Sequence, residues 1–274
     1  MGLIEFIINI YMLAFGLRLF MPAASPFSEN PIQRGLYTAT EPVLRPIRQV
    51  IMRGEPRFDW SPVFAIIALV IVRGFLVTTV MGVPLSSSLA AGMLDVFDFV
   101  VRVLAILFLG AFFISIESPF AFSQSGHMMH NIAHFFLAPI RRFTGYRIGR
   151  PDASALLGIV LLGVLHGLVL YQAGAMVTQA VGTPVEMILE SIVYVIDFIF
   201  DVLFIVILVR AVLSFFNPDT GNTLFQILIL FSDPILAPIR RILPSTYGID
   251  FSPLIAILIL RFIQVSLLPL LLRI

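Results

Sequence analysis

One tripeptide occurs three times in the chain: Pro46-Ile47-Arg48, Pro139-Ile140-Arg141 and Pro238-Ile239-Arg240. Another proline lies 20 residues before the proline of each copy, and an Asp-Xaa-Ser sequence begins 12 or 13 residues after it. These flanking residues are Pro26, Pro119 and Pro218 on one side and Asp59, Asp152 and Asp250 on the other. Spacing that is kept this closely over three copies indicates an internal repeat.

The chain around these motifs is too apolar for a water-soluble globule. Of its 274 residues, 59% are apolar and 12% are charged, and its mean hydropathy is +1.03. Soluble domains contain about 45–50% apolar and about 25% charged residues, and disordered chains are more polar still. Because a membrane-spanning helix needs about 20 mostly apolar residues, the sequence predicts six spans. They are Leu3–Phe20, Pro62–Val80, Leu94–Ile116, Ala153–Tyr171, Ser191–Phe215 and Pro253–Leu272.

Each copy of the tripeptide lies between two of these spans, so the repeated unit is a helix, a long polar segment and a second helix. We therefore expect an all-α polytopic membrane protein made of three parallel two-helix repeats, at residues 1–82, 83–174 and 175–274. Short interfacial helices are expected in the long segments, for example at Leu224–Phe231. Where the second helix begins, the aspartate or serine can cap free N–H groups, and a proline such as Pro253 suits the first turn.

The arginines are distributed unevenly among the connecting segments. Residues 21–61, 117–152 and 216–252 contain five, four and two arginines, whereas residues 81–93 and 172–190 contain none. Because basic loops stay in the cytoplasm, this alternation predicts cytoplasmic long segments and periplasmic termini in a bacterial inner membrane. Glu5 and the lack of arginine beside it favour a retained first helix over a cleavable signal.

Polar side chains recur at matching positions inside the predicted spans. They are Glu5, Asn9, Asp98, Arg102, Asp197 and Asp201 in the first helices, and Arg73, His166, Arg261 and Gln264 in the second helices. Because charges inside a bilayer are rare and usually paired, we expect the acids to meet the Arg, His or Gln side chains of the same repeat. Such pairs either hold helices together, which we favour, or form an ion or proton path. Asp197 and Asp201 with Arg261 are the best candidate site, since two close acids repel unless a cation or proton intervenes.

The tripeptide arginines are expected at the membrane interface, where guanidinium groups pair with lipid phosphate. The predicted motif and lipid-facing residues are Pro46, Arg48, Asp59, Pro139, Arg141, Arg142, Asp152, Pro238, Arg240, Arg241, Asp250, Ser252 and Pro253, with Arg18 and Arg210 in the first helices. Anionic membrane lipids are therefore the expected partners. The net charge of +1 gives no indication of nucleic-acid binding.

Three histidines, His127, His130 and His134, are spaced so that a helix would place them on one face. That spacing permits a metal or haem ligand set. Since no acid or cysteine lies close to them in the sequence, we favour an interfacial helix and expect no cofactor. The sequence also contains no Gly-rich phosphate loop, no His-Glu-x-x-His and no Gly-x-Ser-x-Gly, which predicts a non-enzymatic protein.

Two stretches of the third copy closely resemble the YggT/YlmG family: Asp233-Pro234-Ile235-Leu236-Ala237-Pro238-Ile239-Arg240-Arg241 and Gly248-Ile249-Asp250-Phe251-Ser252-Pro253. The first copy resembles it through Glu41-Pro42 and Asp59-Trp60-Ser61-Pro62, whereas the middle copy has His134-Phe135 in place of the acid and proline. The resemblance implies a protein that organises or assembles membrane components, in division, envelope organisation or stress tolerance, with membrane-protein partners or as a homo-oligomer. An ion channel or transporter linked to osmotic tolerance is the alternative.

Overall fold

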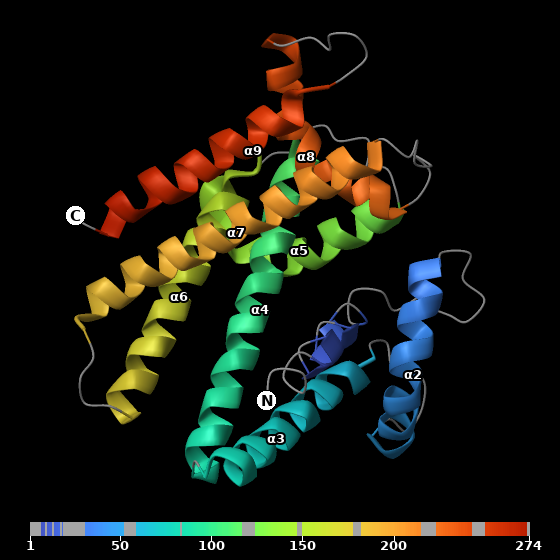
Figure 1. Cartoon of the computed structure of the whole chain (residues 1–274), viewed down its shortest axis with the longest axis vertical. Helices are drawn as coiled ribbons and strands as arrows, with labels where there is room; N and C mark the ends of the chain where they lie inside the picture. The colour runs from blue at the N-terminus through green and yellow to red at the C-terminus, as the bar shows by residue number, and fades with distance from the viewer. Residues whose placement is uncertain are drawn as a thin grey trace. The chain divides into compact units, whose positions relative to one another are not determined.

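The computed structural model describes residues 7–8, 10–12, 14–16, 18, 31–51, 59–82, 84–116, 124–146, 150–177, 182–214, 223–242 and 250–272. Most of these residues form helices, and no strand occurs among them (Figure 1). The helices are α2 (Pro31–Ile51), α3 (Ser61–Met81), α4 (Leu85–Ser115), α5 (Gln124–Thr144), α6 (Ala153–Val177), α7 (Pro184–Ser214), α8 (Thr223–Ile242) and α9 (Ser252–Phe262), then the π-helical turn η2 (Ile263–Leu267) and the 3₁₀ turn η3 (Leu268–Leu272). The predicted all-α class is confirmed.

Five helical stretches of the described residues are long and apolar enough to cross a membrane. They are Ser61–Val80, Leu85–Ser115, Ala153–Gly174, Pro184–Ser214 and Ser252–Leu272. The predicted first span, Leu3–Phe20, lies largely outside the described residues, so the six-span layout and the three repeat boundaries stay predictions. By its contacts the chain divides into two compact units, Met1–Phe99 and Val100–Ile274.

Two of these helices begin well before the predicted spans. Both α4 and α7 contain 31 residues and begin nine and seven residues before the predicted spans. At the start of α7, the Thr183 hydroxyl accepts the N–H of Glu186, whose carboxylate accepts the N–H of Thr183. This capping box begins the helix outside its apolar stretch, so a search for apolar residues alone missed the first turns.

The arginine-bearing segments form long amphipathic helices rather than short ones. The expected short helix at Leu224–Phe231 is part of α8, which has 20 residues, and α2 and α5 each have 21. All three continue through the tripeptide, although an interior proline removes a backbone hydrogen bond. Pro42, Pro46 and Pro139 lie on exposed faces, where water or headgroups can reach the freed carbonyl groups. The helices therefore extend beyond the short segments that the sequence predicted.

The same repeat positions are buried in both units. In the first unit, Leu44 of α2 and Ala65 of α3 belong to one cluster of buried side chains. In the second unit, a Cβ added at Gly158 of α6 would lie 2.9 Å from the side chains of Leu137 and Phe108. Leu137 and Gly158 occupy the repeat positions of Leu44 and Ala65. A leucine of the amphipathic helix thus packs on a small residue of the following span in each case.

In the second unit, α7 packs against α6, α8 and α9 (Figure 1). Its approach to α6 is closest at two glycines. A Cβ at Gly163 would lie 2.7 Å from the Cα of Ile192, and one at Gly167 would lie 2.6 Å from the Cα of Ile188. Small residues four positions apart let helices pack closely in a membrane. Because the nearest atoms are backbone atoms, a side chain at either glycine would force the helices apart.

Gly167→Leu should therefore lower the Tm of the detergent-solubilised protein, measured by circular dichroism, since overpacking costs about 1–3 kcal/mol or more. Gly35→Ala is the control, because nothing lies within 4 Å of the Cβ that it would add and alanine favours a helix over glycine. The control should leave Tm unchanged or raise it. A Gly167→Leu protein as stable as the wild type would contradict the close packing of α6 on α7.

Candidate functional site

An arginine in the last turn of each amphipathic helix pairs with the aspartate that precedes the next span. The pairs are Arg48–Asp59, Arg141–Asp152 and Arg240–Asp250, with nitrogen–oxygen distances of 2.7, 2.5 and 2.8 Å. We call them the helix-turn ion pairs. The middle pair is buried and the other two are partly exposed. Each pair closes the turn between a helix that bears arginines and a helix able to cross the membrane.

The second oxygen of each aspartate binds the start of the following helix. Oδ1 of Asp59 accepts the N–H of Ser61 at 3.0 Å and its hydroxyl at 2.6 Å. The backbone N–H contact recurs in the other two copies, in Asp152–Ser154 and Asp250–Ser252. Since the first N–H groups of a helix have no partner inside the helix, one carboxylate both holds the arginine and satisfies a helix end.

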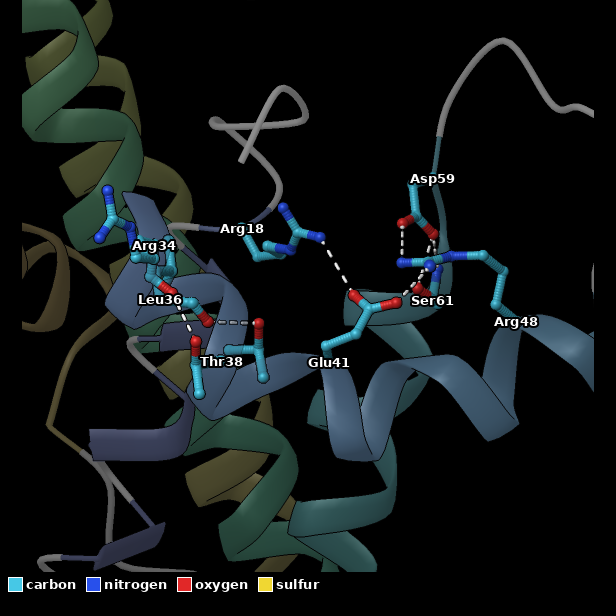
Figure 2. Close-up of polar contacts among 9 residues, drawn as sticks. Arg18, Arg34, Leu36, Thr38, Glu41, Arg48, Asp59 and Ser61 are labelled. Carbon is cyan, nitrogen blue, oxygen red and sulfur yellow. Dashed lines mark hydrogen bonds and ion pairs between the residues drawn. The ribbon is translucent and has the colours of Figure 1, made fainter. Parts of the chain in front are cut away.

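In the first unit, the helix-turn ion pair extends into a chain of four charges (Figure 2). Glu41 of α2 lies between two arginines, with its carboxylate oxygens 3.2 Å from Arg18 and 2.9 Å from Arg48. Arg48 then continues to Asp59. Because Arg18 belongs to the helical residues near the N-terminus, the charges link three successive helical segments.

The third copy repeats this chain in the second unit. Oδ1 of Asp233 lies 2.6 Å from Nη1 of Arg210 and 3.4 Å from Nη1 of Arg240. Arg210 also donates to the hydroxyl of Ser232 at 2.5 Å. Since Arg240 reaches Asp250, the four charges join α7, α8 and the start of α9.

The middle copy retains only two of these four charges. Ala111 stands where the other copies have the first arginine, and His134 stands where they have the acid. Nε and Nη2 of Arg141 both donate to Oδ2 of Asp152. The guanidinium carbon lies 4.7 Å from the centroid of the Tyr146 ring. Among the described residues, Nη1 of Arg141 is buried without a hydrogen-bond partner.

A second polar cluster joins α7 to the C-terminal span. Nη1 of Arg261 lies 3.0 Å from Oδ1 of Asp201. Nε2 of Gln264 donates to Asp197 at 2.8 Å and to Asp201 at 3.0 Å, and its oxygen accepts from Arg261 at 2.6 Å. We call these four residues the α7–α9 cluster. They are the residues that the repeat register predicted would meet in the third copy.

The turn that carries Gln264 is π-helical. In η2 the N–H of Leu268 donates to the carbonyl of Ile263, five residues earlier. Pro269 follows, and a proline supplies no N–H and crowds the carbonyl four residues before it. The wider π-helical turn leaves room for the proline ring and for the missing backbone hydrogen bond. Single π turns inside helices are frequent at functional sites.

Two acids of the α7–α9 cluster, Asp197 and Asp201, lie inside the candidate span Pro184–Ser214 of α7. Asp201 follows the first residue of that span by 17 residues and precedes the last by 13. Arg261 and Gln264 lie inside the candidate span Ser252–Leu272. The whole cluster therefore belongs to helices long and apolar enough to cross a membrane.

Three further residues of the predicted polar set, Arg73, Arg102 and His166, contact partners that the sequence did not predict. Arg73 of α3 pairs with Asp95 of α4. Arg102 of α4 donates to the Tyr194 hydroxyl at 2.8 Å, and the His166 ring of α6 stacks on the Tyr194 ring with centroids 5.3 Å apart. Asp95 and Tyr194 occupy the same repeat position. In the first two copies the second helix therefore meets the first helix of the next copy, because a short connector makes the two helices neighbours. In the third copy the second helix meets the first helix of its own copy, as predicted.

Comparison with known proteins gives the family. The CCB3/YggT family model matches residues 1–80 and 189–271, which together exceed half of the chain. The chain belongs to the CCB3/YggT family. The matched ranges contain the first and third helix-turn ion pairs and omit the middle one.

Two relatives of the chain are described as uncharacterized proteins. The chain is 36% identical over 135 residues to an uncharacterized protein of Haemophilus influenzae, and 31% identical over 130 residues to the uncharacterized protein YggT of Escherichia coli K12. These alignments cover 49% and 47% of this chain and 68% and 64% of the relatives. The chain thus spans about two thirds of the length of each relative. No solved structure matches it.

In this CCB3/YggT chain, only part of the predicted lipid-facing set is exposed. Arg142 and Arg241 are exposed on α5 and α8. Arg48, Arg141 and Arg240 instead direct their guanidinium groups to the aspartates of the helix-turn ion pairs. The tripeptide arginine therefore pairs with the aspartate of the turn, and in the middle and third copies the arginine after it is exposed and available to a partner.

Several predicted residues lie outside the described set. Glu5, Asn9 and the side chain of His127 belong to this group. The rings of His130 and His134 lie on α5 with centroids 6.3 Å apart. In the part of the chain that the structure describes, no group of three or more His, Cys, Asp or Glu side chains is arranged to hold a metal ion.

Sequence reasoning missed two acids of the site, Glu41 and Asp233. Each precedes the tripeptide arginine of its copy by seven residues, which is two turns along one helix face, and this spacing was the available signal. For Asp95 and Tyr194, the available signal was that both occupy the same position of the repeat. The sequence prediction instead used Asp98, which lies about one turn farther along α4.

The helix-turn aspartates outside the spans have perturbed acidity. Burial opposes the ionised form of Asp59 and Asp250, but hydrogen bonds from serine and arginine outweigh it and hold the pKa of each carboxyl below its usual range. Burial likewise opposes the charged form of Arg48, yet Asp59 and Glu41 raise its pKa. Asp59, Asp250 and Arg48 are therefore charged at neutral pH.

A lowered folded-state pKa stabilises the fold above the unfolded-state value of about 4, and this contribution is lost as pH falls through the folded-state value. Tm in detergent should therefore decrease between about pH 5 and pH 3. Asp59→Asn combined with Asp250→Asn should lower Tm at pH 7 and reduce this acid-induced decrease. Glu190→Gln, at an exposed position of α7, is the control. An unchanged pH profile in the double variant would exclude the proposed role of the aspartates.

Proposed function

We propose that this protein is a non-enzymatic, multi-pass protein of the bacterial inner membrane that organises or assembles membrane components through α2, α5 and α8. Membership of the CCB3/YggT family and the five candidate spans support a membrane protein. The organising role rests on the side chains that the three amphipathic helices expose.

The observation that carries the proposal is an exposed apolar residue at one repeat position. Val50, Phe143 and Ile242 each follow the tripeptide proline by four residues, and they are 80, 91 and 80% exposed. The exposed Arg142 and Arg241 directly precede two of them. Arginine beside an exposed large apolar side chain on an amphipathic helix is typical of a helix that lies in a membrane interface.

In that position the exposed arginines reach the depth of lipid phosphates, where each contributes about 1 kcal/mol of attraction to anionic lipids. Because basic segments stay in the cytoplasm, we assign α2, α5 and α8 to the cytoplasmic face and both termini to the periplasm. A membrane protein or a second copy would dock against the same arginine-bearing faces. Division, envelope organisation and stress tolerance are the processes in which we expect this role.

Arg142→Gln combined with Arg241→Gln should reduce the Tm gained when the protein moves from neutral nanodiscs to nanodiscs containing phosphatidylglycerol. Arg142→Lys combined with Arg241→Lys keeps both charges and should behave nearly as the wild type. In a deletion strain under osmotic shift, the lysine pair should restore normal cell length and the glutamine pair should not. Full lipid response and full complementation by the glutamine pair would refute the proposal.

An ion or proton pathway is the second candidate, and the α7–α9 cluster favours it. Two carboxylates face one guanidinium there, and the side chains of Arg261 and Asp201 are 40 and 47% exposed in the single chain. An uncompensated negative charge at membrane depth is costly unless a cation or proton joins it. In the structural alternative, the same contacts only attach α7 to the C-terminal span.

Flux measurements separate the two candidates. Proteoliposomes loaded with K⁺ or with a pH-sensitive dye should show no protein-dependent flux if the protein organises membranes. Asp201→Asn and Arg261→Gln should then only lower Tm, since they break a pair that joins α7 to α9. If these variants instead change flux at normal abundance, the organising role fails and the pathway is supported.

A further inference from the structure

The middle copy contains a buried guanidinium edge for which the described residues supply no acceptor. The Arg141 side chain is 7% exposed, and its Nη1 has no hydrogen-bond partner there. Its Nε and Nη2 both donate to Asp152. A buried cationic donor without an acceptor is destabilising, so this edge is suited to an oxygen from outside the chain.

The other two copies show which group belongs at this edge. Nη1 of Arg48 donates to Glu41 at 2.9 Å, and Nη1 of Arg240 donates to Asp233 at 3.4 Å. Both acids lie seven residues before the arginine, on the same face of the same helix. In the middle copy this position is His134, whose side chain is exposed. The middle copy therefore keeps the arginine and lacks the anionic oxygen that the outer copies bring to it.

We propose that Nη1 of Arg141 binds a phosphate oxygen where the outer copies hold a carboxylate. Guanidinium and phosphate form strong charge-assisted hydrogen bonds. Arg142 and Arg150 lie nearby in the sequence and are exposed. Residues 117–152 contain four arginines against two acids, the largest positive excess of the three arginine-bearing segments. The middle copy is thus the one that attracts an anion and has a donor for it.

Two contacts prepare Arg141 for this ligand. The guanidinium carbon lies 4.7 Å from the centroid of the Tyr146 ring, and Asp152 takes one edge of the group. These contacts hold the guanidinium in place before a ligand arrives, so little further ordering is required on binding. The phosphate belongs either to a lipid headgroup or to free inorganic phosphate. For a lipid, the inference rests on the interfacial position of α5 proposed above.

The substitution His134→Glu tests the site because it restores the acid of the outer copies. It should raise the Tm of the full chain in neutral detergent without phosphate, since the new carboxylate accepts from Nη1. It should also weaken inorganic phosphate binding about tenfold or more, because the site is filled and a like charge is added. His134→Gln has a similar size without the charge and should keep the phosphate-dependent rise in Tm.

Two arms distinguish the source of the phosphate. A Tm rise on titration of inorganic phosphate in neutral detergent indicates the free anion, and a rise only in nanodiscs containing phosphatidic acid indicates a headgroup. Either rise supports the inference if His134→Glu abolishes it and His134→Gln does not. No rise with either source, or equal rises in both variants, overturns it. If the phosphatidylglycerol response is lost in the protein with Arg142→Gln and Arg241→Gln but kept in the His134→Glu protein, the proposed function is supported and the phosphate site at Arg141 is refuted.

Discussion

One carboxylate in each copy holds together two helices that must run in different directions. In the first copy, Asp59 binds Arg48 with one oxygen and Ser61 with the other. The end of the arginine-bearing helix carries partial negative charge and the start of the span carries partial positive charge. An arginine at the first and an aspartate at the second neutralise both ends and attract each other. The rest of the fold depends on this turn, because it sets where each span begins relative to its amphipathic helix.

The outer copies and the middle copy close the same turn with different sets of charged side chains. Arg18 and Glu41 join the turn of the first copy to a preceding helical segment, and the third copy repeats this. In the middle copy both added charges are absent together, with Ala111 and His134 in their places. The paired loss preserves charge balance, since removing one member alone would leave a partly buried charge without compensation. Its remaining ion pair is also the most buried of the three.

Contacts inside the spans cross the limits of the repeats in the first two copies and stay within the repeat in the third. Arg73 reaches Asp95, and His166 reaches Tyr194, because each pair joins helices connected by a short segment. In the C-terminal span, the partners of Gln264 lie on α7. A π-helical turn before Pro269 accompanies that arrangement. The sequence register therefore indicated which positions are polar, and in the third copy it also indicated which positions meet.

The sequence alone determined the helical class, five of the six predicted apolar spans and the residue types of the helix-turn ion pairs, because these follow from local composition and from spacing repeated three times. It also indicated the α7–α9 cluster, whose four residues share one register. Tertiary structure decided that the helices continue through Pro46 and Pro139, since only exposure shows that the freed carbonyl groups remain accessible. It also decided the partners of Arg73 and Arg102 and the unmatched edge of Arg141. These depend on which helices pack together and on what becomes buried between them, and spacing along one chain does not encode either.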